Sequence, residues 1–480
     1  MAMYLIVAVA LLVLYLFRAN SALKTVPDLV RKASPHRWTK EEVQETYERV
    51  KKEPFDFTRL LPRRLDRRYV VVGGSGLVGG DIVLQLLQRG QPAKSIRIVD
   101  FAPVTRRDML DKAAGCEYVK ADISSRASVE AAFSKPWPKS VADKPLTVFH
   151  TAALVRPQER NPLFYHRVSP VNRDGAINVL EVARAAGADV FVATSSASVG
   201  VVPSPLWTWP WQSEPKLYAQ IITEKDFDAP LRPHHQFFST YALSKAEAER
   251  AICAANSPSF RTGVIRPGNP IYGQKSDPIV GANLRMRNSY TWISHVVQNC
   301  VNSRNVALAH LQFEAALLSS SSDTLPRCAG RPFVVTDPGP PVTYGDVYGA
   351  LEQLAVTPYR CIQVQPVPLL LIAHAIEAWC IFVARLPAGV RRALPFLREP
   401  KGELHLLQPP VFTVSTHAIV DDSAARKSVT EGGIGYTPGC TTLEGVCEEL
   451  FEWNLEYEGK EVEEGEVWKT EHRAENGHAK

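Results

Sequence analysis

The sequence of 480 residues is long enough for two or three average domains, or for one large α/β unit with a smaller second one, and with 45% hydrophobic and 22% charged residues it can bury a sizeable core. Its net charge of +5 is small for this length and its basic residues are dispersed, which argues against a nucleic-acid partner. Eight cysteines lack a CxxC pair or metal-binding spacing, so we expect reduced thiols in a cytosol-facing protein, with no disulfide framework and no metal.

The N-terminus carries an uncharged apolar run over residues 2–17, which would span about 24 Å as a helix. A cleaved signal peptide is the alternative, but such a peptide carries positive charge before its apolar run. Here the basic residues follow the run, and the positive-inside rule then keeps the body in the cytosol. We therefore predict a membrane anchor over residues 1–20. Residues 21–67 read as a polar tether with one helix beginning near Thr39.

Residues 69–100 read as a strand, a glycine-rich turn, an amphipathic helix, a second strand and an acid. Glycines at 73, 76 and 79 would allow the tight turn, the close approach of a pyrophosphate and the packing of helix on strand. Asp100 stands where a ribose-diol acceptor is expected, and its carboxylate would repel a 2′-phosphate. This predicts NAD rather than NADP as the cofactor. Three nearby arginines weaken the choice: Arg97, Arg106 and Arg107.

Further strands and helices alternate along the chain, which predicts a doubly wound parallel sheet. A strand over 117–120 runs into Asp122 and Ile123, where an acid could bond the adenine amino group. A strand over 146–150 runs into small residues that include Ala152, and the strand over 190–194 ends in serines. Reactive groups of such sheets collect at the carboxyl ends of the strands. Asn172 could bond the neighbouring active-site backbone or a water, or simply start a helix.

A second site signal is the pair Tyr241 and Lys245, whose spacing of four places both side chains on one helix face. A phenol is a weak base near neutral pH, but a neighbouring ammonium and a nicotinamide cation favour the phenolate. The pair can therefore accept a proton, Lys245 can also reach the nicotinamide ribose, and a serine at the end of the 190–194 strand can hold the substrate oxygen.

Two segments interrupt this pattern. Residues 201–240 are rich in Pro and Trp, and could form an apolar lid over a lipid-like substrate or pack on the body. Residues 367–384 are apolar but carry His374 and Glu377, which are costly inside a bilayer. We predict a helix in the membrane interface, followed by basic residues facing anionic lipid, with a buried core helix as the alternative.

Taken together, the motifs resemble the extended short-chain dehydrogenase/reductases of the 3β-hydroxysteroid dehydrogenase family over residues 68–451. The family's glycine turn matches Gly73, Gly76 and Gly79, and its ribose acid matches Asp100. Its Asp-Ile pair matches Asp122 and Ile123, and its His-Thr-Ala-Ala run matches residues 150–153. Its catalytic pair matches Tyr241 and Lys245. Its catalytic serine aligns best with Ser196, and Ser195 is the one-residue alternative. The segments 266–273 and 305–310 also match, whereas 333–337 and 421–438 resemble members that act on sterol 4α-carboxylates.

The resemblance implies an NAD-binding Rossmann domain over 68–275 and a substrate-binding and membrane-associated region over 276–453. Residues 454–480 are charged and lack apolar periodicity, which predicts a disordered tail. It also implies an endoplasmic reticulum enzyme that oxidises the 3β-hydroxyl of a sterol or terpenoid ring. A 4α-carboxysterol is the first choice, because the segments 333–337 and 421–438 resemble members that act on such substrates. The product β-keto acid would then lose carbon dioxide, and other sterol-demethylation enzymes would be partners. The alternatives are a secondary-metabolite dehydrogenase, an added isomerase step, and a non-catalytic NAD-sensing scaffold.

Overall fold

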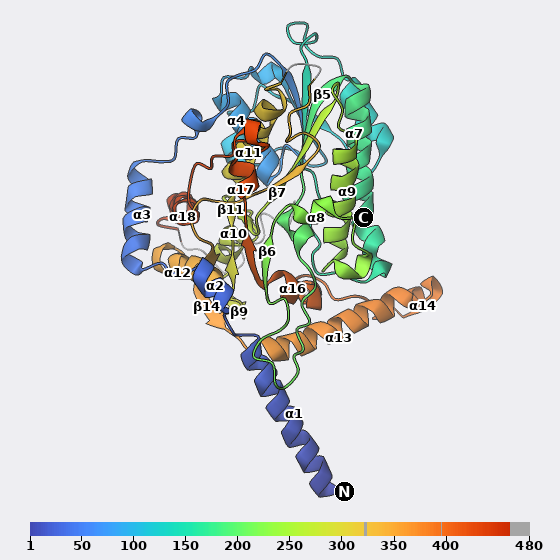
Figure 1. The fold of residues 1–480 in the computed structure, drawn as a ribbon, viewed down its shortest axis with the longest axis vertical. Coiled ribbons are helices and arrows are strands. Elements are labelled where there is room, and N and C mark those ends of the chain that lie inside the picture. Colours follow the sequence, from blue (N-terminus) through green and yellow to red (C-terminus); the bar gives the residue numbers. More distant parts are fainter. Residues whose placement is uncertain (321–323, 395, 461–480) are drawn as a thin grey trace.

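The computed structural model describes residues 1–320, 324–394 and 396–460. Seven parallel strands form the central sheet: β1 (Arg68–Val72), β2 (Ile96–Asp100), β3 (Glu117–Lys120), β4 (Leu146–His150), β5 (Ala188–Thr194), β7 (Arg261–Pro267) and β12 (Pro332–Val335). They lie in the order β12-β7-β5-β4-β1-β2-β3, which confirms the predicted parallel Rossmann sheet (Figure 1).

Helices cover both faces of this sheet because their apolar residues recur at helical spacing. One face packs against α4 (Leu77–Gln88) and α11 (Ser303–Leu317), which share a core with Tyr69 and Val71 of β1. The other face packs against α6 (Arg126–Ser134), α7 (Ala176–Ala185) and α9 (Thr240–Ala254). The strand ends that carry the predicted motifs are therefore held between two packed layers.

The second part of the molecule is built around a four-stranded sheet in the order β13-β10-β15-β6. Its strands are β6 (Ala219–Ile222), β10 (Val297–Gln298), β13 (Val342–Thr343) and β15 (His417–Val420). Two short pairs flank it: β8 (Ile271–Tyr272) with β11 (Val301–Asn302), and β9 (Asn288–Thr291) with β14 (Arg360–Gln363). The remaining helices of this part are α8 (Lys225–Asp228), α10 (Val280–Leu284), α12 (Tyr344–Leu354), α16 (Pro409–Val414), α17 (Ser423–Arg426) and α18 (Thr442–Tyr457).

The predicted division of the two regions at residue 275 needs correction. α11 and β12 lie after that residue but complete the Rossmann layers, whereas β6 lies before it and pairs with β15 of the second sheet. The chain therefore crosses between the two parts several times, because each sheet recruits strands that are far apart in sequence.

Residues 21–67 are more closely attached to the body than a free tether. They contain α2 (Asp28–Ala33) and α3 (Lys40–Lys52), and α3 begins with a capping box between Thr39 and Glu42, near the predicted helix start. Val43, Tyr47 and Val50 of α3 are buried in a core shared with α12 and α18. The prediction of a tether is corrected for this helix, whose apolar face packs on the body.

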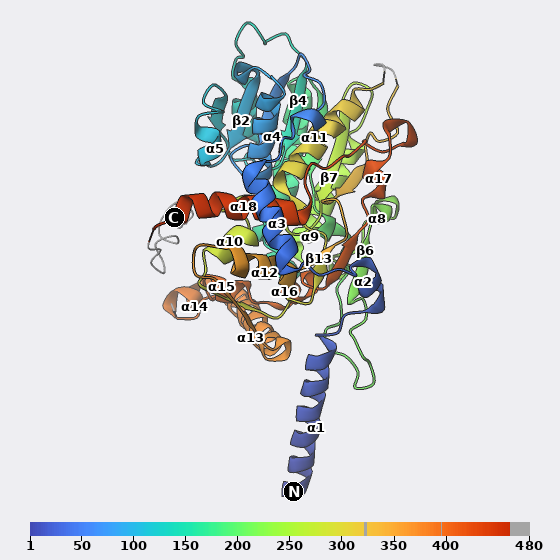
Figure 2. The same ribbon diagram turned by 90° about the vertical axis from the view of Figure 1, so that its left-hand side faces the viewer.

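The end of the molecule away from the central sheet carries two strongly apolar helices. α1 (Ala2–Ala22) projects from the body with most of its residues exposed, and α13 (Pro366–Arg385) crosses the base of the body (Figure 1 and Figure 2). Both helices are long and apolar enough to cross a membrane by length and composition. α13 is followed by α14 (Ala388–Ala393) and α15 (Glu403–Leu406), and a short α5 (Arg107–Leu110) follows β2.

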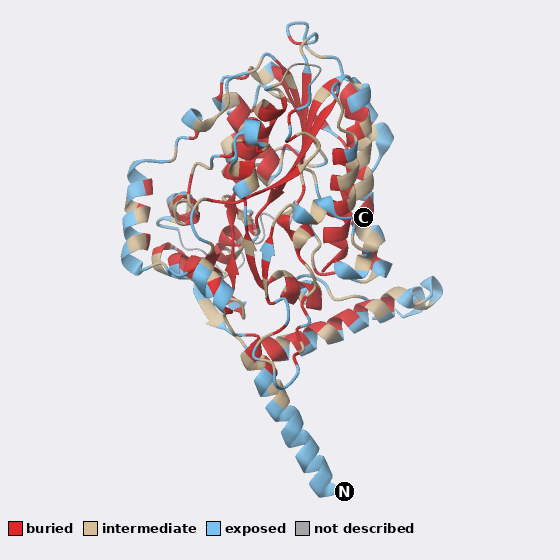
Figure 3. Cartoon of the chain, in the orientation of Figure 1, coloured by how far each residue is buried: buried red, intermediate tan, exposed pale blue. Residues whose placement is uncertain are grey.

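α13 is neither fully buried nor fully exposed (Figure 3). Leu370, Ala373 and Cys380 on one face are buried, whereas the opposite face exposes large apolar side chains. These exposed residues are Leu371, Ile372, Trp379 and Phe382. The ionisable His374 and Glu377 contact the body instead, because His374 accepts a hydrogen bond from Trp207 and Glu377 binds Arg160.

The tryptophan-rich part of the 201–240 segment packs on the body, and Phe238 near the end of the segment lines the large cavity at the strand ends. Trp207 stacks on Tyr15 of α1 and on His374 of α13, while Trp209 and Trp211 stack on each other at the surface. At the other end of the chain, α18 runs past residue 454, where the tail was predicted to begin, and Asn454 is buried. Residues 461–480 lie outside the described part of the chain.

Candidate active site

A cavity of about 1000 Å³ lies at the carboxyl ends of the central strands. Asn172 does not line it, whereas all the cofactor-binding and catalytic candidates of the sequence analysis do: Gly73, Gly76, Gly79, Asp100, Asp122, Ile123, Ala152, Ser196, Tyr241 and Lys245. These residues come from separate elements, and the parallel sheet brings them together because its strands all end at the same edge. Sequence reasoning missed other wall residues, which carry no motif: Leu154, Val155, Pro157, Phe238 and Val414.

The glycine turn fits a closely approaching dinucleotide. Gly73 has a φ of +82°, which L side chains rarely adopt, and a Cβ at Gly79 would lie 2.2 Å from the carbonyl oxygen of Gly73. A Cβ at Gly76 would meet only that oxygen, at 3.3 Å, so the protein itself leaves room there. The space on the cavity side of Gly76 suits a pyrophosphate at the N-terminus of α4.

Gly79→Ala is expected to lower the free energy of unfolding by about 1–3 kcal/mol, as overpacking does, and to weaken dinucleotide binding because the turn must shift. Chemical denaturation and titration with dinucleotide would measure both effects. Gly349→Ala is the matched control, since a methyl group at this helical glycine would have no neighbour within 4 Å beyond the adjoining helix backbone. Equal behaviour of the two variants would contradict the packing argument.

Asp100 ends β2 on the cavity wall. Its carboxylate accepts hydrogen bonds from the backbone N–H groups of Ser75, at 3.0 Å, and Ala102, at 3.2 Å. Burial raises the pKa of this carboxyl, and the backbone donors partly offset the rise. These two donors orient the carboxylate and leave further lone pairs to accept hydrogen bonds from a ribose diol.

The three nearby arginines all have acidic partners. Arg97 is buried and binds Glu117, with its guanidinium 4.1 Å from the centre of the Trp137 ring. Arg106 binds Asp81 and Asp108, and Arg107 pairs with Glu456. Because these guanidinium groups already form ion pairs with carboxylates, they are poor candidates for binding the 2′-phosphate of NADP.

The catalytic candidates meet deep in the cavity. Burial raises the pKa of Tyr241 to about 12, and a hydrogen bond with Ser196 partly offsets this rise. Burial lowers the pKa of Lys245 to about 8, and its ammonium donates to the carbonyl oxygen of Thr194 at 2.6 Å. Ser196 also lies 2.8 Å from the Ser198 hydroxyl. The contact with Tyr241 favours Ser196 over Ser195, although both line the cavity.

Asn172 bonds the neighbouring backbone, as one of the open alternatives proposed. Its side chain accepts from the N–H of Leu154 and donates to the carbonyl oxygen of the same residue and to Ser244 on α9. It begins no regular α-helix, because residues 170–175 form a π-helical turn before α7. Asn172 therefore connects the cavity wall to the helix that carries Tyr241.

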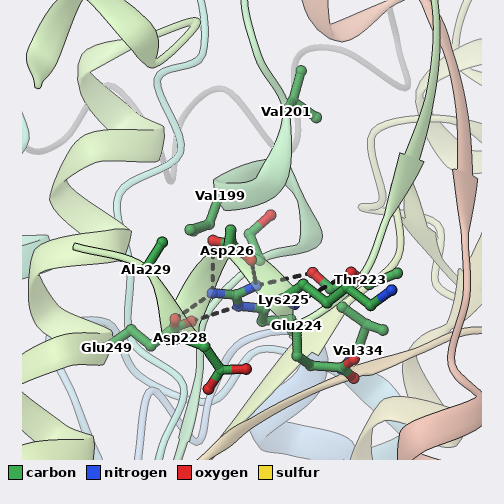
Figure 4. Close-up of polar contacts among 12 residues, drawn as sticks. Val199, Val201, Thr223, Glu224, Lys225, Asp226, Asp228, Ala229, Glu249 and Val334 are labelled. Carbon is green, nitrogen blue, oxygen red and sulfur yellow. Dashed lines mark hydrogen bonds and ion pairs between the residues drawn. The ribbon is translucent and has the colours of Figure 1, made fainter. Parts of the chain in front are cut away.

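A buried ionic cluster supports the catalytic helix from behind. Glu249 lies one turn beyond Lys245 and accepts two hydrogen bonds from Arg266, at 2.9 and 2.5 Å. Arg266 is 1% exposed and also binds Asp226, at 2.6 and 3.1 Å, and the carbonyl oxygen of Thr223. Figure 4 shows its partners Thr223, Asp226 and Glu249 around one guanidinium group. Since Asp226 belongs to the 201–240 segment, the cluster ties this segment to β7 and α9.

One group of potential metal ligands occurs in the described residues outside this cavity. Side-chain atoms of Cys380, Glu399 and His405 all lie within 4.8 Å of one another. Both oxygens of Glu399 accept hydrogen bonds from Arg167, at 2.6 and 2.9 Å. Because the arginine already neutralises this carboxylate, the group serves as a contact between elements.

The Rossmann sheet, the glycine turn, the acid after β2 and the Ser/Tyr/Lys cluster define an NAD(P)-dependent oxidoreductase of the extended short-chain dehydrogenase class. The candidate cofactor-binding residues fit such a dinucleotide, since the turn leaves space at Gly76 and Asp100 faces the same cavity.

Comparison with known proteins gives the family. The model of the 3-beta hydroxysteroid dehydrogenase/isomerase family matches residues 70–364. The chain belongs to this family, as its motifs predicted. The decarboxylating sterol-4-alpha-carboxylate 3-dehydrogenase of Schizosaccharomyces pombe is 28% identical over 335 residues, covering 68% of this chain and 86% of that protein. The Gibberella zeae protein of the same name is 30% identical over 233 residues, covering 47% of this chain and 69% of that protein.

Solved structures confirm the fold. UDP-glucose 4-epimerase from Thermotoga maritima aligns with a TM-score of 0.52 and 17% identity, covering 81% of this chain and 99% of the epimerase. At this identity the likeness concerns the fold alone. Membership of the 3-beta hydroxysteroid dehydrogenase/isomerase family makes the chain an NAD(P)-dependent oxidoreductase acting on CH–OH groups.

Proposed function

We propose that this protein oxidises the 3β-hydroxyl of a sterol 4α-carboxylate with NAD and releases carbon dioxide from the product. The observation that carries the proposal is the meeting of Ser196, Tyr241 and Lys245 in a cavity with an apolar outer wall. The names of the Schizosaccharomyces pombe and Gibberella zeae relatives support the same substrate class.

The residues divide the work of oxidation. Ser196 donates a hydrogen bond to the substrate oxygen, and the Tyr241 phenolate takes the hydroxyl proton as general base. Lys245 stabilises that phenolate through its positive charge. NAD, when bound, accepts the hydride that leaves the substrate carbon. The oxidation therefore gives a ketone, with the proton on Tyr241 and two electrons on the cofactor.

Loss of carbon dioxide needs no further protein group. With a carboxylate on the adjacent ring carbon, the ketone is a β-keto acid, and breaking the bond to the carboxyl carbon leaves an enolate. Ser196 and the newly protonated Tyr241 both face the ketone oxygen and can donate hydrogen bonds to the enolate oxygen.

The proposal is tested by incubating membranes that contain the protein with NAD and a 3β-hydroxy-4α-carboxysterol. NADH absorbance and released carbon dioxide are followed together, and Tyr241→Phe provides the blank. Equal amounts of both products support the proposal. NADH without carbon dioxide would mean simple alcohol oxidation, and neither product would exclude this substrate and turn attention to triterpenoid or meroterpenoid alcohols.

The preference for NAD over NADP rests on Asp100. Asp100→Ala removes the ribose acceptor and the charge that repels a 2′-phosphate, so the ratio of kcat/KM for NAD to that for NADP should fall about tenfold or more. Steady-state rates with each cofactor measure the ratio. Asp111→Ala removes an exposed carboxylate outside the cavity and should keep the wild-type ratio. An unchanged ratio in Asp100→Ala would contradict the assignment.

We also propose attachment to the endoplasmic reticulum membrane with the catalytic part in the cytosol. α1 supplies the span, and the exposed face of α13 lies in the interface, beside basic residues that suit anionic lipid. The positions of the two helices support this assignment, since α13 runs across the base of the body from which α1 projects. The basic residues are Arg385, Arg391, Arg392, Arg398 and Lys401. An association with other sterol-demethylation enzymes remains a prediction.

A chain that begins at Leu23 is expected to retain binding to vesicles containing phosphatidylserine through α13. Replacing Trp379 and Phe382 with aspartate should lower that binding at least about tenfold, because each aromatic side chain contributes ~1.5–3 kcal/mol when buried. Vesicle flotation measures the bound fraction. Leu455→Asp, an exposed position on α18, is the control. Equal vesicle binding by the shortened chain, its double variant and its control would contradict the placement of α13 in the membrane interface.

A further inference from the structure

The outer rim of the active-site cavity is apolar and exposed. Leu154 and Val155 follow β4, line the cavity, and are 38% and 67% exposed. The next residue, Arg156, lies 3.2 Å from His405 of α15. His405 is flanked by Leu404 and Leu406, which are 52% and 50% exposed. The contact between Arg156 and His405 therefore has exposed apolar residues on both sides: those of the cavity rim next to Arg156, and those of α15 next to His405.

α15 in turn lies against α13. The side-chain atoms of Cys380 on α13 and of His405 on α15 lie within 4.8 Å of each other. Trp379 of α13 donates its indole N–H to the carbonyl oxygen of Arg398, at 3.0 Å, in the segment that leads to α15. The apolar rim of the cavity is thus connected through α15 to α13, at the buried Cys380 and next to the exposed Trp379.

Several charged groups at this junction are paired with one another. Glu377 of α13 accepts two hydrogen bonds from Arg160, both at 2.7 Å. Glu399 binds Arg167, which also reaches the buried carboxylate of Glu159 at 2.6 Å. Mutual pairing of these charges means that an apolar molecule passing over α15 does not have to desolvate isolated ions.

A second connection runs through the cavity floor. Val414 of α16 lines the cavity, and Phe412 of the same helix packs in one cluster with Leu370 and Ala373 on the buried face of α13. The short helix α16 therefore lies between α13 and the cavity, and the cavity is close to the surface that we assign to the membrane interface.

We propose that the apolar surface from α13 over α15 to Leu154 and Val155 is a portal through which a sterol-like substrate passes from the bilayer into the active site without crossing water. The inference rests on the proposed function, since a membrane-dissolved substrate is what gives such a portal its use. Lipid is favoured over a protein occupant because the surface is connected to α13 and is bordered by the basic residues that follow this helix.

The first test locates the portal without turnover. The full chain is reconstituted in phosphatidylcholine/phosphatidylserine vesicles that contain a photoreactive 3β-hydroxysterol, illuminated, and digested for mass spectrometry. Adducts within residues 154–157 and 403–407 are expected. Adducts confined to α1, or to a face of the body remote from α15, would overturn the portal. Because the probe needs no oxidation, this result is independent of the proposed reaction.

The second test compares routes of delivery. Leu404→Asp combined with Leu406→Asp should lower the ratio of the rate with vesicle-borne substrate to the rate with micelle-borne substrate about tenfold, because two aspartates must then be dehydrated at the portal. Leu110→Asp, an exposed leucine on α5, should keep the wild-type ratio. An unchanged ratio in the double variant would overturn the portal. Absence of turnover in the wild type by either route would instead count against the proposed substrate.

Discussion

Tyr241→Phe is expected to lower kcat by about 100- to 10,000-fold, the usual contribution of a general base, while dinucleotide affinity stays near its wild-type value. The phenyl ring preserves the packing of this buried residue, and only the hydroxyl that we propose as the proton acceptor is lost. Stopped-flow measurement of NADH formation would give the rate, and titration with dinucleotide would give the affinity.

The pH dependence distinguishes the loss of a base from a packing defect. Burial raises the pKa of Tyr241, and a proton acceptor must lose its own proton first, so the wild-type rate should rise with pH from neutral to alkaline. The Tyr241→Phe rate should lose that rise. Tyr47→Phe removes a buried phenol hydroxyl on α3, far from the cavity, and should retain both rate and profile. A rising profile that survives in Tyr241→Phe would assign the proton transfer to another group.

The cofactor half of the site could be predicted from sequence because its signals are local. A glycine turn, a strand and an acid occur within residues 69–100, and each strand of a parallel sheet delivers its last residues to the same edge. The Tyr241 and Lys245 pair is also local, since a spacing of four on one helix is enough to bring both side chains into the cavity.

The substrate side of the site could not be predicted in the same way. β6 pairs with β15, and Arg156 meets His405, through contacts between segments far apart in the chain. The burial of α3 against α18 has the same origin. Val155 and Val414 became wall residues only because of such long-range packing, and an isolated valine has no pattern that indicates a cavity.

Arg266 is a further example, since nothing in its sequence neighbourhood indicates that it is fully buried between Glu249 and Asp226. Arg266→Met is expected to lower the free energy of unfolding by about 3–5 kcal/mol, because it leaves the Glu249 carboxylate buried without its cation. Chemical denaturation in detergent measures the change. Arg331→Met breaks an exposed pair with Asp228 and should cost no more than about 1 kcal/mol.

The double variant Arg266→Met with Glu249→Met identifies the physical origin of that loss. If an unpaired buried charge causes it, removal of both groups should restore part of the stability, so the two effects are not additive. Simple addition of the two losses would instead indicate that Arg266 acts by packing. Glu249 also raises the pKa of Lys245, which burial lowers to about 8, so its removal should lower that pKa further. Lys245 would then lose its positive charge at a lower pH, so the rise of the rate with pH should end at a lower pH in the double variant than in the wild type.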